Sequence, residues 1–405
     1  MHLSVPVHNV QIDERAKWTR DRAKVQRRLS RWRRKSWFDS GAELFALSRA
    51  RYDDQDEQWE CTHLLGRGSF GMVGQWTKFD RHGRAVDTMA IKQTDIDDRE
   101  VDRQKHLAIP WEVLIMRGLA DQGCRNVGGL RKYKLFIADP PKWRYYLEYH
   151  RHGTLAGLVE RYRDHNHEHP RHKDYIPEAF IWQALYGFAQ TAYHMSTVRF
   201  DKSVAPPGKD HFVLHLDLKH ENVLMCEAST DEDLINYPTL KVGDWGMAEY
   251  TSRDDVHNSH RWKYQGTIVW CPPEQLRQGQ YGRHWKHPVL GGPDHPFTMA
   301  HVIWQIGANI YGLMELELDN LDLYERVKRY ETSESSLRHN GYSVLSHWNN
   351  SRYSSKLMDL VEDCVRLDPA RRPSPRELVA RAQQGLKPHV DKARRTGSAP
   401  KVRLD

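Results

Sequence analysis

Apolar and polar positions alternate along the chain from Trp59 to about residue 150. The runs WECTHLLGRGSFGMVGQWTKFD and DTMAIKQ have a period of two and are separated by a turn signal at residues 81–84, which predicts antiparallel strands. Two more strand-like runs, KYKLFIAD and WRYYLEYH, flank the turn signal DPPK. Between these pairs, PWEVLIMRGLA begins with a proline typical of a first helical turn. This run is therefore predicted to form a helix.

After Gly153 the pattern becomes helical, in TLAGLVERYRD, IPEAFIWQALYGFAQTAYHMS, AHVIWQIGANIYGLM and YSSKLMDLVEDCVRL. A strand-rich part followed by a helix-rich part predicts an α+β fold with two lobes. We expect residues 1–58 to form a basic N-terminal arm that is partly helical or disordered. The predicted small lobe covers residues 59–149 and the larger lobe residues 150–385, and residues 386–405 are expected to be a disordered basic tail.

Composition excludes several classes of protein. The 405 residues exceed the size at which one core stops growing, so two lobes are the expected organisation. No run of about 18 apolar residues and no secretory leader are visible, which predicts a soluble protein of the cytoplasm or nucleus. The five cysteines are widely spread without a C-x-x-C pair. Neither a disulfide framework nor a zinc knuckle is therefore expected.

The net charge of +7 is concentrated in one segment. Residues 14–35 contain eleven basic and two acidic side chains, so the rest of the chain has a net charge of −2. Four apolar side chains of this segment share one face if it is helical: Trp18, Val25, Leu29 and Trp32. Such a helix binds an acidic partner, an import receptor or an anionic membrane, and a solvated tail is the alternative. Because the body is not basic, nucleic acid is not expected as the main partner.

A glycine-rich segment carries the first candidate chemistry. Gly66, Gly68 and Gly71 have G-x-G-x-x-G spacing, which allows backbone N–H groups to approach phosphate oxygens. Dinucleotide-binding folds use the same spacing but continue into a helix, whereas here the sequence continues to alternate. We therefore expect a loop between antiparallel strands. Lys92 follows on the next strand, and Glu112 lies inside an apolar helix, so the two are expected to pair and to direct Lys92 toward nucleotide phosphates.

Three later motifs complete an ordered set: HLDLKHEN at 215–222, VGDWG at 242–246 and GTIVWCPPEQ at 266–275. With these motifs the chain resembles the eukaryotic protein kinases of the serine/threonine type over residues 59–385. The resemblance implies the two-lobed kinase fold and transfer of the ATP γ-phosphate to protein Ser/Thr hydroxyls with Mg²⁺ or Mn²⁺. It also implies that Asp217 accepts or orients the substrate hydroxyl proton, that Lys219 contacts the γ-phosphate, and that Lys92 and Glu112 form the catalytic ion pair.

The same resemblance implies the remaining site residues. Asn222 and Asp244 would be the metal ligands, since both supply hard oxygen donors. The activation segment and its anchor would include Trp245, Gly246, Thr267, Glu274 and Arg372. The expected ATP contacts are Leu65, Gly66, Gly68, Gly71, Val73, Ala90, Lys92, Leu147, Glu148, Tyr149, His150 and Leu224.

Four residues depart from the family pattern: Leu216, Trp245, Pro272 and Val302. Leu216 stands where many kinases have an arginine that binds a phosphorylated activation loop, so a regulatory contact is absent while the catalytic residues are present. Val302 stands where kinases place an aspartate that accepts hydrogen bonds from the catalytic loop. Valine cannot accept them, so either His301 or water substitutes or the loop is looser. These departures leave open a pseudokinase scaffold that binds nucleotide or partner proteins with little turnover. The segments GTIVWCPPEQ and IWQIG are also similar to segments of divergent kinases from filamentous fungi.

Overall fold

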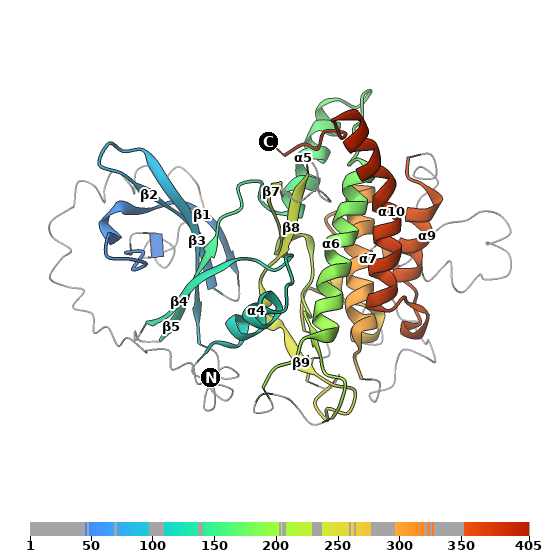
Figure 1. Ribbon diagram of the computed structural model, residues 1–405, viewed down its shortest axis with the longest axis horizontal. Helices are drawn as coiled ribbons and strands as arrows, with labels where there is room; N and C mark the ends of the chain where they lie inside the picture. The colour runs from blue at the N-terminus through green and yellow to red at the C-terminus, as the bar shows by residue number, and fades with distance from the viewer. Residues whose placement is uncertain are drawn as a thin grey trace. The chain divides into compact units, whose positions relative to one another are not determined.

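The computed structural model forms two compact units (Figure 1). It describes residues 45–46, 48–68, 71–96, 109–136, 141–201, 204, 208–228, 237–258, 261–262, 265–276, 296–319, 322–324, 326–327 and 352–404. The basic segment at 14–35 lies outside these ranges, so its predicted partners remain predictions. The first unit contains the described residues up to Leu114 together with Gly129–Tyr149, and the second contains Ile115–Gly128 and the rest.

The first unit is built on a five-stranded antiparallel sheet with the strand order β1-β2-β3-β5-β4. Its strands are β1 (Trp59–Gly68), β2 (Gly71–Phe79), β3 (Ala85–Asp95), β4 (Leu130–Phe136) and β5 (Lys142–Glu148), and the helix is α4 (Trp111–Asp121). A short 3₁₀ turn, η1 (Asp56–Gln58), precedes β1. The strands and the helix predicted from the hydrophobic pattern are all present.

The two faces of this sheet are covered by different segments, because side chains alternate across a strand. On one face Met89 and Ile91 belong to a buried cluster with Trp76 and Tyr146. On the other face Val113 of α4 packs with Trp143 and Tyr145 of β5. Lys92 follows Ile91 on β3 and therefore lies on the face that carries α4.

The face opposite α4 is covered by residues that precede the predicted small lobe. We call residues 45–46 and 48–52 the N-terminal strap. Phe45, Ala46 and Ala50 are buried in the same cluster as Trp76. The expectation that the arm extends to residue 58 is therefore wrong for the strap. Its apolar side chains cover the sheet face opposite α4, whose apolar residues would otherwise be exposed to solvent.

Hydrogen bonds also hold the strap to the sheet. The Arg144 guanidinium on β5 donates to the Arg49 carbonyl at 2.5 Å and to Ser48 Oγ at 2.6 Å. Tyr146 on the same strand donates its hydroxyl to the Ala50 carbonyl at 2.8 Å. Burial is the main cause that raises the pKa of this tyrosine, so the hydroxyl remains a donor. The strap is thus part of the folded domain.

The second unit is mainly helical. Its helices are α5 (Leu155–Glu168), α6 (Glu178–Thr197), α7 (Met299–Glu315), α9 (Ser355–Cys364) and α10 (Pro375–Thr396). Two small two-stranded antiparallel sheets pair β6 (Phe212–Leu214) with β9 (Glu249–Thr251), and β7 (Val223–Ala228) with β8 (Pro238–Val242). The 3₁₀ turns are η2 (His220–Asn222), η4 (Trp245–Met247), η5 (Ile268–Trp270), η6 (Pro273–Gln275) and η9 (Pro369–Arg371). Of the helices described, none combines the length and the apolar character needed to cross a membrane.

Residues 115–128 pack with the second unit, although they lie between β3 and β4 in sequence and were predicted to belong to the small lobe. Val127 forms a parallel bridge with Val242 of β8. Asn126 donates its side-chain amide to the Leu240 carbonyl at 2.9 Å, and its own carbonyl accepts from Val242 N at 2.7 Å. Backbone pairing with β8 thus decides where this segment belongs.

The C-terminal residues are ordered, which contradicts the predicted disordered tail from residue 386. Helix α10 continues to Thr396 and buries Leu378, Ala382, Leu386 and Ala393. Gly385 of this helix lies close to the Trp182 ring on α6. Small side chains allow α10 to approach α6 closely. The residues from 386 to 396 are therefore ordered by packing against the second unit, and not by a strong helix propensity of their own.

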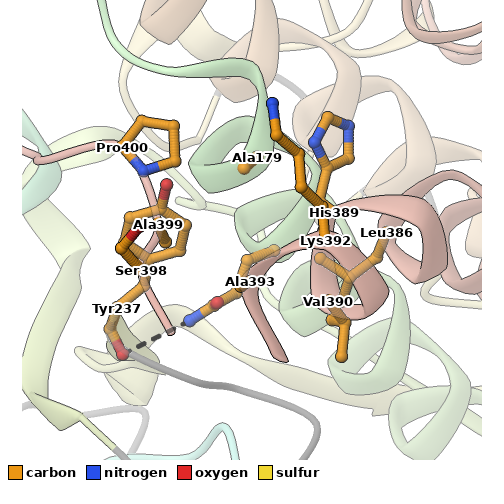
Figure 2. A pocket seen from close by; sticks show the side chains of 11 residues that line it. Ala179, Tyr237, Leu386, His389, Val390, Lys392, Ala393, Ser398, Ala399 and Pro400 are labelled. Carbon is orange, nitrogen blue, oxygen red and sulfur yellow. Dashed lines mark hydrogen bonds between the residues drawn. The ribbon is translucent and has the colours of Figure 1, made fainter. Parts of the chain in front are cut away.

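The residues after α10 return along the second unit. Arg403 Nε is 2.8 Å from Asp174 Oδ2, and the Arg403 carbonyl accepts from Arg161 Nε at 3.0 Å. Figure 2 shows Ser398, Ala399 and Pro400 beside α6 and α10, around a cavity of about 60 Å³. Small-molecule sites usually measure at least about 300 Å³, so this cavity is a packing defect of the folded tail.

Candidate active site

An ion pair between β3 and α4 is present as predicted. Lys92 Nζ lies 2.9 Å from each carboxylate oxygen of Glu112. Both side chains are less than a tenth exposed, and the Tyr145 ring lies 6.0 Å from the ammonium group. A buried charge pair is held firmly only with good geometry and additional partners. The two equal distances meet the first of these conditions.

Three predicted ATP contacts lie on the same face of the sheet as Lys92. Val73 on β2 is the cross-strand partner of Lys92, and Ala90 on β3 is the partner of Leu147 on β5. Directly opposed residues of an antiparallel pair point to the same face, as do alternate residues of one strand. Val73, Ala90, Lys92 and Leu147 therefore form one mainly apolar surface with a single ammonium group, which suits a base and a phosphate.

The glycine-rich segment forms the end of the β1–β2 hairpin, where Gly68 pairs with Gly71. Gly71 has a φ of +118°, and a side chain there would meet the Gln93 carbonyl oxygen at 2.0 Å. Only glycine fits this position. Leu65 is 47% exposed on β1, as single apolar side chains on protein surfaces often are.

The other predicted ATP contacts lie at or beyond the end of β5. Glu148 ends the strand, and its backbone N–H donates to the Gly129 carbonyl at 2.9 Å. Tyr149 is the last residue of the first unit. His150 directly follows it and belongs to the second unit. Leu224 lies on β7 in the second unit and forms an isolated bridge with Thr154.

The catalytic-loop residues converge on Asp217, which is 4% exposed. Its Oδ1 accepts from the Thr267 backbone N–H at 2.8 Å. Its Oδ2 lies 3.1 Å from Lys219 Nζ and 3.2 Å from Asn222 Nδ2. Lys219 Nζ also donates to Thr267 Oγ1 at 2.7 Å. Two hydrogen bonds and one ion pair thus hold the Asp217 carboxylate in a single orientation.

The residues before Asp217 fix its backbone. His215 bonds the Gly243 carbonyl through Nε2 at 3.1 Å, and its Nδ1 accepts the Asp217 N–H at 3.4 Å. Burial is the largest cause that lowers the pKa of His215, which agrees with a neutral ring that uses one nitrogen as donor and the other as acceptor. Leu216 has a φ of +65° and a fully buried side chain. The residue that replaces the family's arginine is therefore a core residue.

The two predicted metal ligands lie at the same end of the β7–β8 hairpin. Asn222 immediately precedes β7, and Asp244 follows β8 by two residues. Val223 pairs with Val242, and the Gly243 N–H donates to the Asn222 carbonyl at 2.8 Å. Asp244 has a φ of +55°. Asn222 uses its amide nitrogen to bond the Asp217 carbonyl at 2.8 Å, so its side-chain oxygen remains the atom that can bind a cation.

These residues fit a magnesium ion that phosphates also coordinate. An amide oxygen and a carboxylate are hard donors, and Mg²⁺ bound to nucleotides usually takes only one or two protein carboxylates. Among the described residues no group of three or more His, Cys, Asp or Glu side chains could enclose a metal on its own. The donor set therefore fits Mg²⁺ better than a structural zinc.

The segment after the metal ligands is anchored at both ends. Trp245 is buried, with its ring 4.6 Å from that of His215, and it donates through Nε1 to the Val242 carbonyl at 3.0 Å. Gly246 follows it on η4 and is exposed. At the far end Glu274 and Arg372 form a two-point ion pair at 2.7 and 2.9 Å. The structure thus brings Thr267 together with Asp217, and Glu274 together with Arg372.

We expect Arg372→Met to destabilise the protein by about 3 kcal/mol, because removing one member leaves a buried charge without compensation. The Arg372 side chain is completely buried and also donates to three backbone carbonyls. Thermal unfolding at neutral pH measures the effect. Arg381→Met is the matched control, since Arg381 pairs with Asp363 while one third exposed, and such pairs contribute at most about 1 kcal/mol. Equal losses in the two variants would contradict the prediction.

The same pair determines a pH dependence. Burial raises the pKa of Glu274, but the Arg372 guanidinium outweighs it and holds this pKa below 4.5. Because the folded state has the lower pKa, the pair stabilises the protein fully above about pH 4.5 and loses that contribution as pH falls through the folded pKa. In Arg372→Met, burial acts without the guanidinium and should raise this pKa, so protonation of Glu274 as pH falls should stabilise the variant instead of destabilising it.

The sequence interpretation considered His301 but missed three other buried polar residues behind the catalytic loop, His220, Gln305 and Asn309. His220 bonds the Asn309 carbonyl through Nε2 at 2.7 Å, and His301 bonds Gln275 Oε1 at 2.8 Å. Burial lowers the pKa of each histidine to about 4. One signal was available, because His301, Gln305 and Asn309 recur every four residues in an otherwise apolar helical run.

Comparison with known proteins agrees with this geometry. A family described as "Protein kinase domain" matches residues 59–382. The G2-specific protein kinase nim-1 of Neurospora crassa is 21% identical over 343 residues, which are 80% of this chain and 33% of that protein. The probable serine/threonine-protein kinase nek2 of Dictyostelium discoideum is 23% identical over 80% of this chain and 62% of that protein.

The G2-specific protein kinase fin1 of Schizosaccharomyces pombe is 23% identical over 80% of this chain and 38% of its own length. The chain therefore spans between about one third and three fifths of these relatives. The matched family covers the sheet, the catalytic loop and the metal ligands. From residue 59 to residue 382, this chain belongs to the protein kinase family.

Proposed function

We propose that the protein is a serine/threonine protein kinase that transfers the ATP γ-phosphate to protein hydroxyls. The observation that carries this proposal is the group of hydrogen bonds on Asp217, which joins Lys219, Asn222 and Thr267 around one buried carboxylate. The names of the relatives support the same activity. The protein substrates of those relatives are not assigned to this chain.

Each residue has a role that follows from its charge. Asp217 is held in place by its polar contacts, so it can orient a substrate hydroxyl and accept its proton. Lys219 is shared between Asp217 and Thr267, which leaves its ammonium group beside the carboxylate, where it can balance the charge of the transferred phosphoryl group. Lys92 is directed by Glu112 and supplies a second cation for the phosphates.

Asn222 and Asp244 would hold the magnesium ion, which when bound neutralises the charge of the triphosphate. The β7–β8 hairpin fixes both ligands through backbone bonds, so the chain itself keeps them in register. The apolar face with Val73, Ala90 and Leu147 would receive the adenine ring. No acidic partner, import receptor or membrane enters this proposal, because residues 14–35 lie outside the described residues.

A pseudokinase scaffold is the second candidate, and two buried residues favour it. Val302 is 1% exposed on α7 and cannot accept a hydrogen bond, and Leu216 removes the arginine that often binds an activation-loop phosphate. The complete set of polar contacts on Asp217 argues against a scaffold, since an inactive site has no need of them.

A transfer assay separates the two candidates. The full chain is incubated with γ-labelled ATP, magnesium and a mixture of generic protein substrates, and labelled amino acids are identified after hydrolysis. The kinase proposal predicts labelled serine or threonine, with the signal abolished by EDTA and restored by added magnesium. Nucleotide binding without any label in the substrates would instead identify a scaffold.

A further inference from the structure

A stripe of polar side chains runs along helix α7 inside the second unit. His301, Gln305 and Asn309 are spaced four residues apart, so they lie on one face of the helix. All three are fully buried, and nearly every other buried residue of this helix is apolar. Buried polar groups destabilise a fold unless they have hydrogen-bond partners. The partners of this stripe therefore indicate what it does.

Asn309 bonds the catalytic loop directly. Its Nδ2 donates to the Leu218 carbonyl at 3.1 Å and to the Gln305 carbonyl at 2.8 Å. The backbone carbonyl oxygen of Asn309 lies 2.7 Å from His220 Nε2. A carbonyl can only accept, so this histidine nitrogen carries the hydrogen. Leu218 and His220 stand on either side of Lys219, and the loop is thus attached to α7 at two points next to Asp217.

The His220 ring is enclosed on both sides. A side chain at Gly312, one turn after Asn309, would meet His220 Cε1 at 2.6 Å, so the absence of a side chain there leaves room for the ring. The Trp270 ring on η5 packs against it with centroids 4.7 Å apart. Because η5 begins directly after Thr267, His220 contacts both α7 and the segment that bonds Asp217.

We propose that Asn309 and His220 are positioning residues that hold the catalytic loop on helix α7, in place of the carboxylate that the chain lacks at residue 302. The Val302 side chain offers no acceptor to the loop. Two turns further along the same helix, Asn309 offers its side-chain amide as a donor and its backbone carbonyl as an acceptor. The proposal rests on the kinase activity proposed above. It explains how the chain keeps Asp217 fixed although the departures from the family pattern at Leu216 and Val302 lie nearby.

Ordinary core packing is the alternative, and α7 provides a matched control. Gln305 lies on the same face and is equally buried, but its side-chain amide has no hydrogen-bond partner among the described residues. Replacing it by leucine removes a buried polar group without removing a bond to the loop. A role in packing alone predicts similar effects at residues 305 and 309, whereas positioning predicts an effect only at 309.

The experiment compares Asn309→Leu, His220→Leu, His220→Gln and Gln305→Leu in the full chain. For each protein, kcat and KM for Mg·ATP are measured at a temperature well below the unfolding midpoint of the least stable variant. We expect kcat to fall about 10- to 100-fold in Asn309→Leu and His220→Leu, because small misplacements of a catalytic group have effects of this size. KM for Mg·ATP should change by no more than about twofold, since the residues proposed to bind the nucleotide are intact.

His220→Gln should recover most of kcat, because its side-chain amide can place a donor near the position of Nε2. Gln305→Leu should keep the wild-type kcat. If Asn309→Leu does not fold, Asn309→Asp tests the same bond, since it keeps the shape and removes the N–H donor.

Three results would overturn the inference: wild-type kcat in both leucine variants at 309 and 220, an equal loss in Gln305→Leu, or no recovery in His220→Gln. A wild-type chain that transfers no phosphate would instead refute the proposed function.

Discussion

Asp217→Asn is expected to lower kcat by about 10²- to 10⁴-fold, the usual contribution of a positioned acid–base group. The amide has one acceptor oxygen where the carboxylate has two. In the wild type, the Thr267 N–H bonds Oδ1, whereas Lys219 and Asn222 contact Oδ2. The asparagine amide cannot accept from both sides. The substitution therefore removes the proton acceptor and misaligns the loop. Transfer of γ-labelled phosphate under saturating Mg·ATP measures the loss.

The control for this variant is Asp210→Asn. Asp210 is exposed and has a φ of +54°, a conformation that asparagine adopts readily. This variant should keep the wild-type kcat and unfolding midpoint. KM for Mg·ATP should stay within a few-fold in Asp217→Asn, since Lys92, Asn222 and Asp244 remain. Equal transfer by the wild type and Asp217→Asn would exclude the mechanism proposed above.

Deletion of residues 1–58 is expected to destabilise the first unit by about 5 kcal/mol, whereas deletion of residues 1–44 should leave the strap and its contacts in place. The longer deletion removes Phe45, which is 2% exposed, and loss of a buried phenylalanine side chain alone costs about 3–5 kcal/mol. It also removes the carbonyl acceptors of Arg144 and Tyr146. Because domains have only about 5–15 kcal/mol of stability, the loss approaches the whole margin.

Thermal unfolding of the two truncated proteins checks this prediction. A difference of 5 kcal/mol corresponds to a shift of about 10 °C or more for a unit of this size. Phe45→Ala in the full chain is the point-substitution test of the same contact, and Val86→Ala is its control, because Val86 is 57% exposed on the same sheet. Similar unfolding midpoints for the two deletions would show that the strap does not contribute to stability.

The sequence predicted those parts of the fold and the site that depend on local patterns. Strand alternation predicted the sheet that carries Lys92, and the resemblance to protein kinases implied the roles of Asp217 and Asn222. Such features require only the chain period and the chemistry of a few residues.

The features that the sequence did not predict depend on contacts between distant segments. The strap has no periodic pattern of its own, and its place depends on burial against the sheet and on bonds from Arg144 and Tyr146, almost a hundred residues later. Likewise residues 386–405 were predicted to be a disordered tail, although Leu386 and Ala393 are buried in α10. Pairwise packing of this kind is not encoded in local propensity.

The bond between the Thr267 amide and Asp217 Oδ1 makes a single backbone proton a reporter of the site. This proton is protected from solvent exchange only while the segment that contains it stays on the carboxylate. Its exchange rate, followed by amide hydrogen–deuterium measurements, would therefore record how often the assembled state opens in the absence of substrate. A ligand that orders the segment would slow that exchange even if it bound elsewhere.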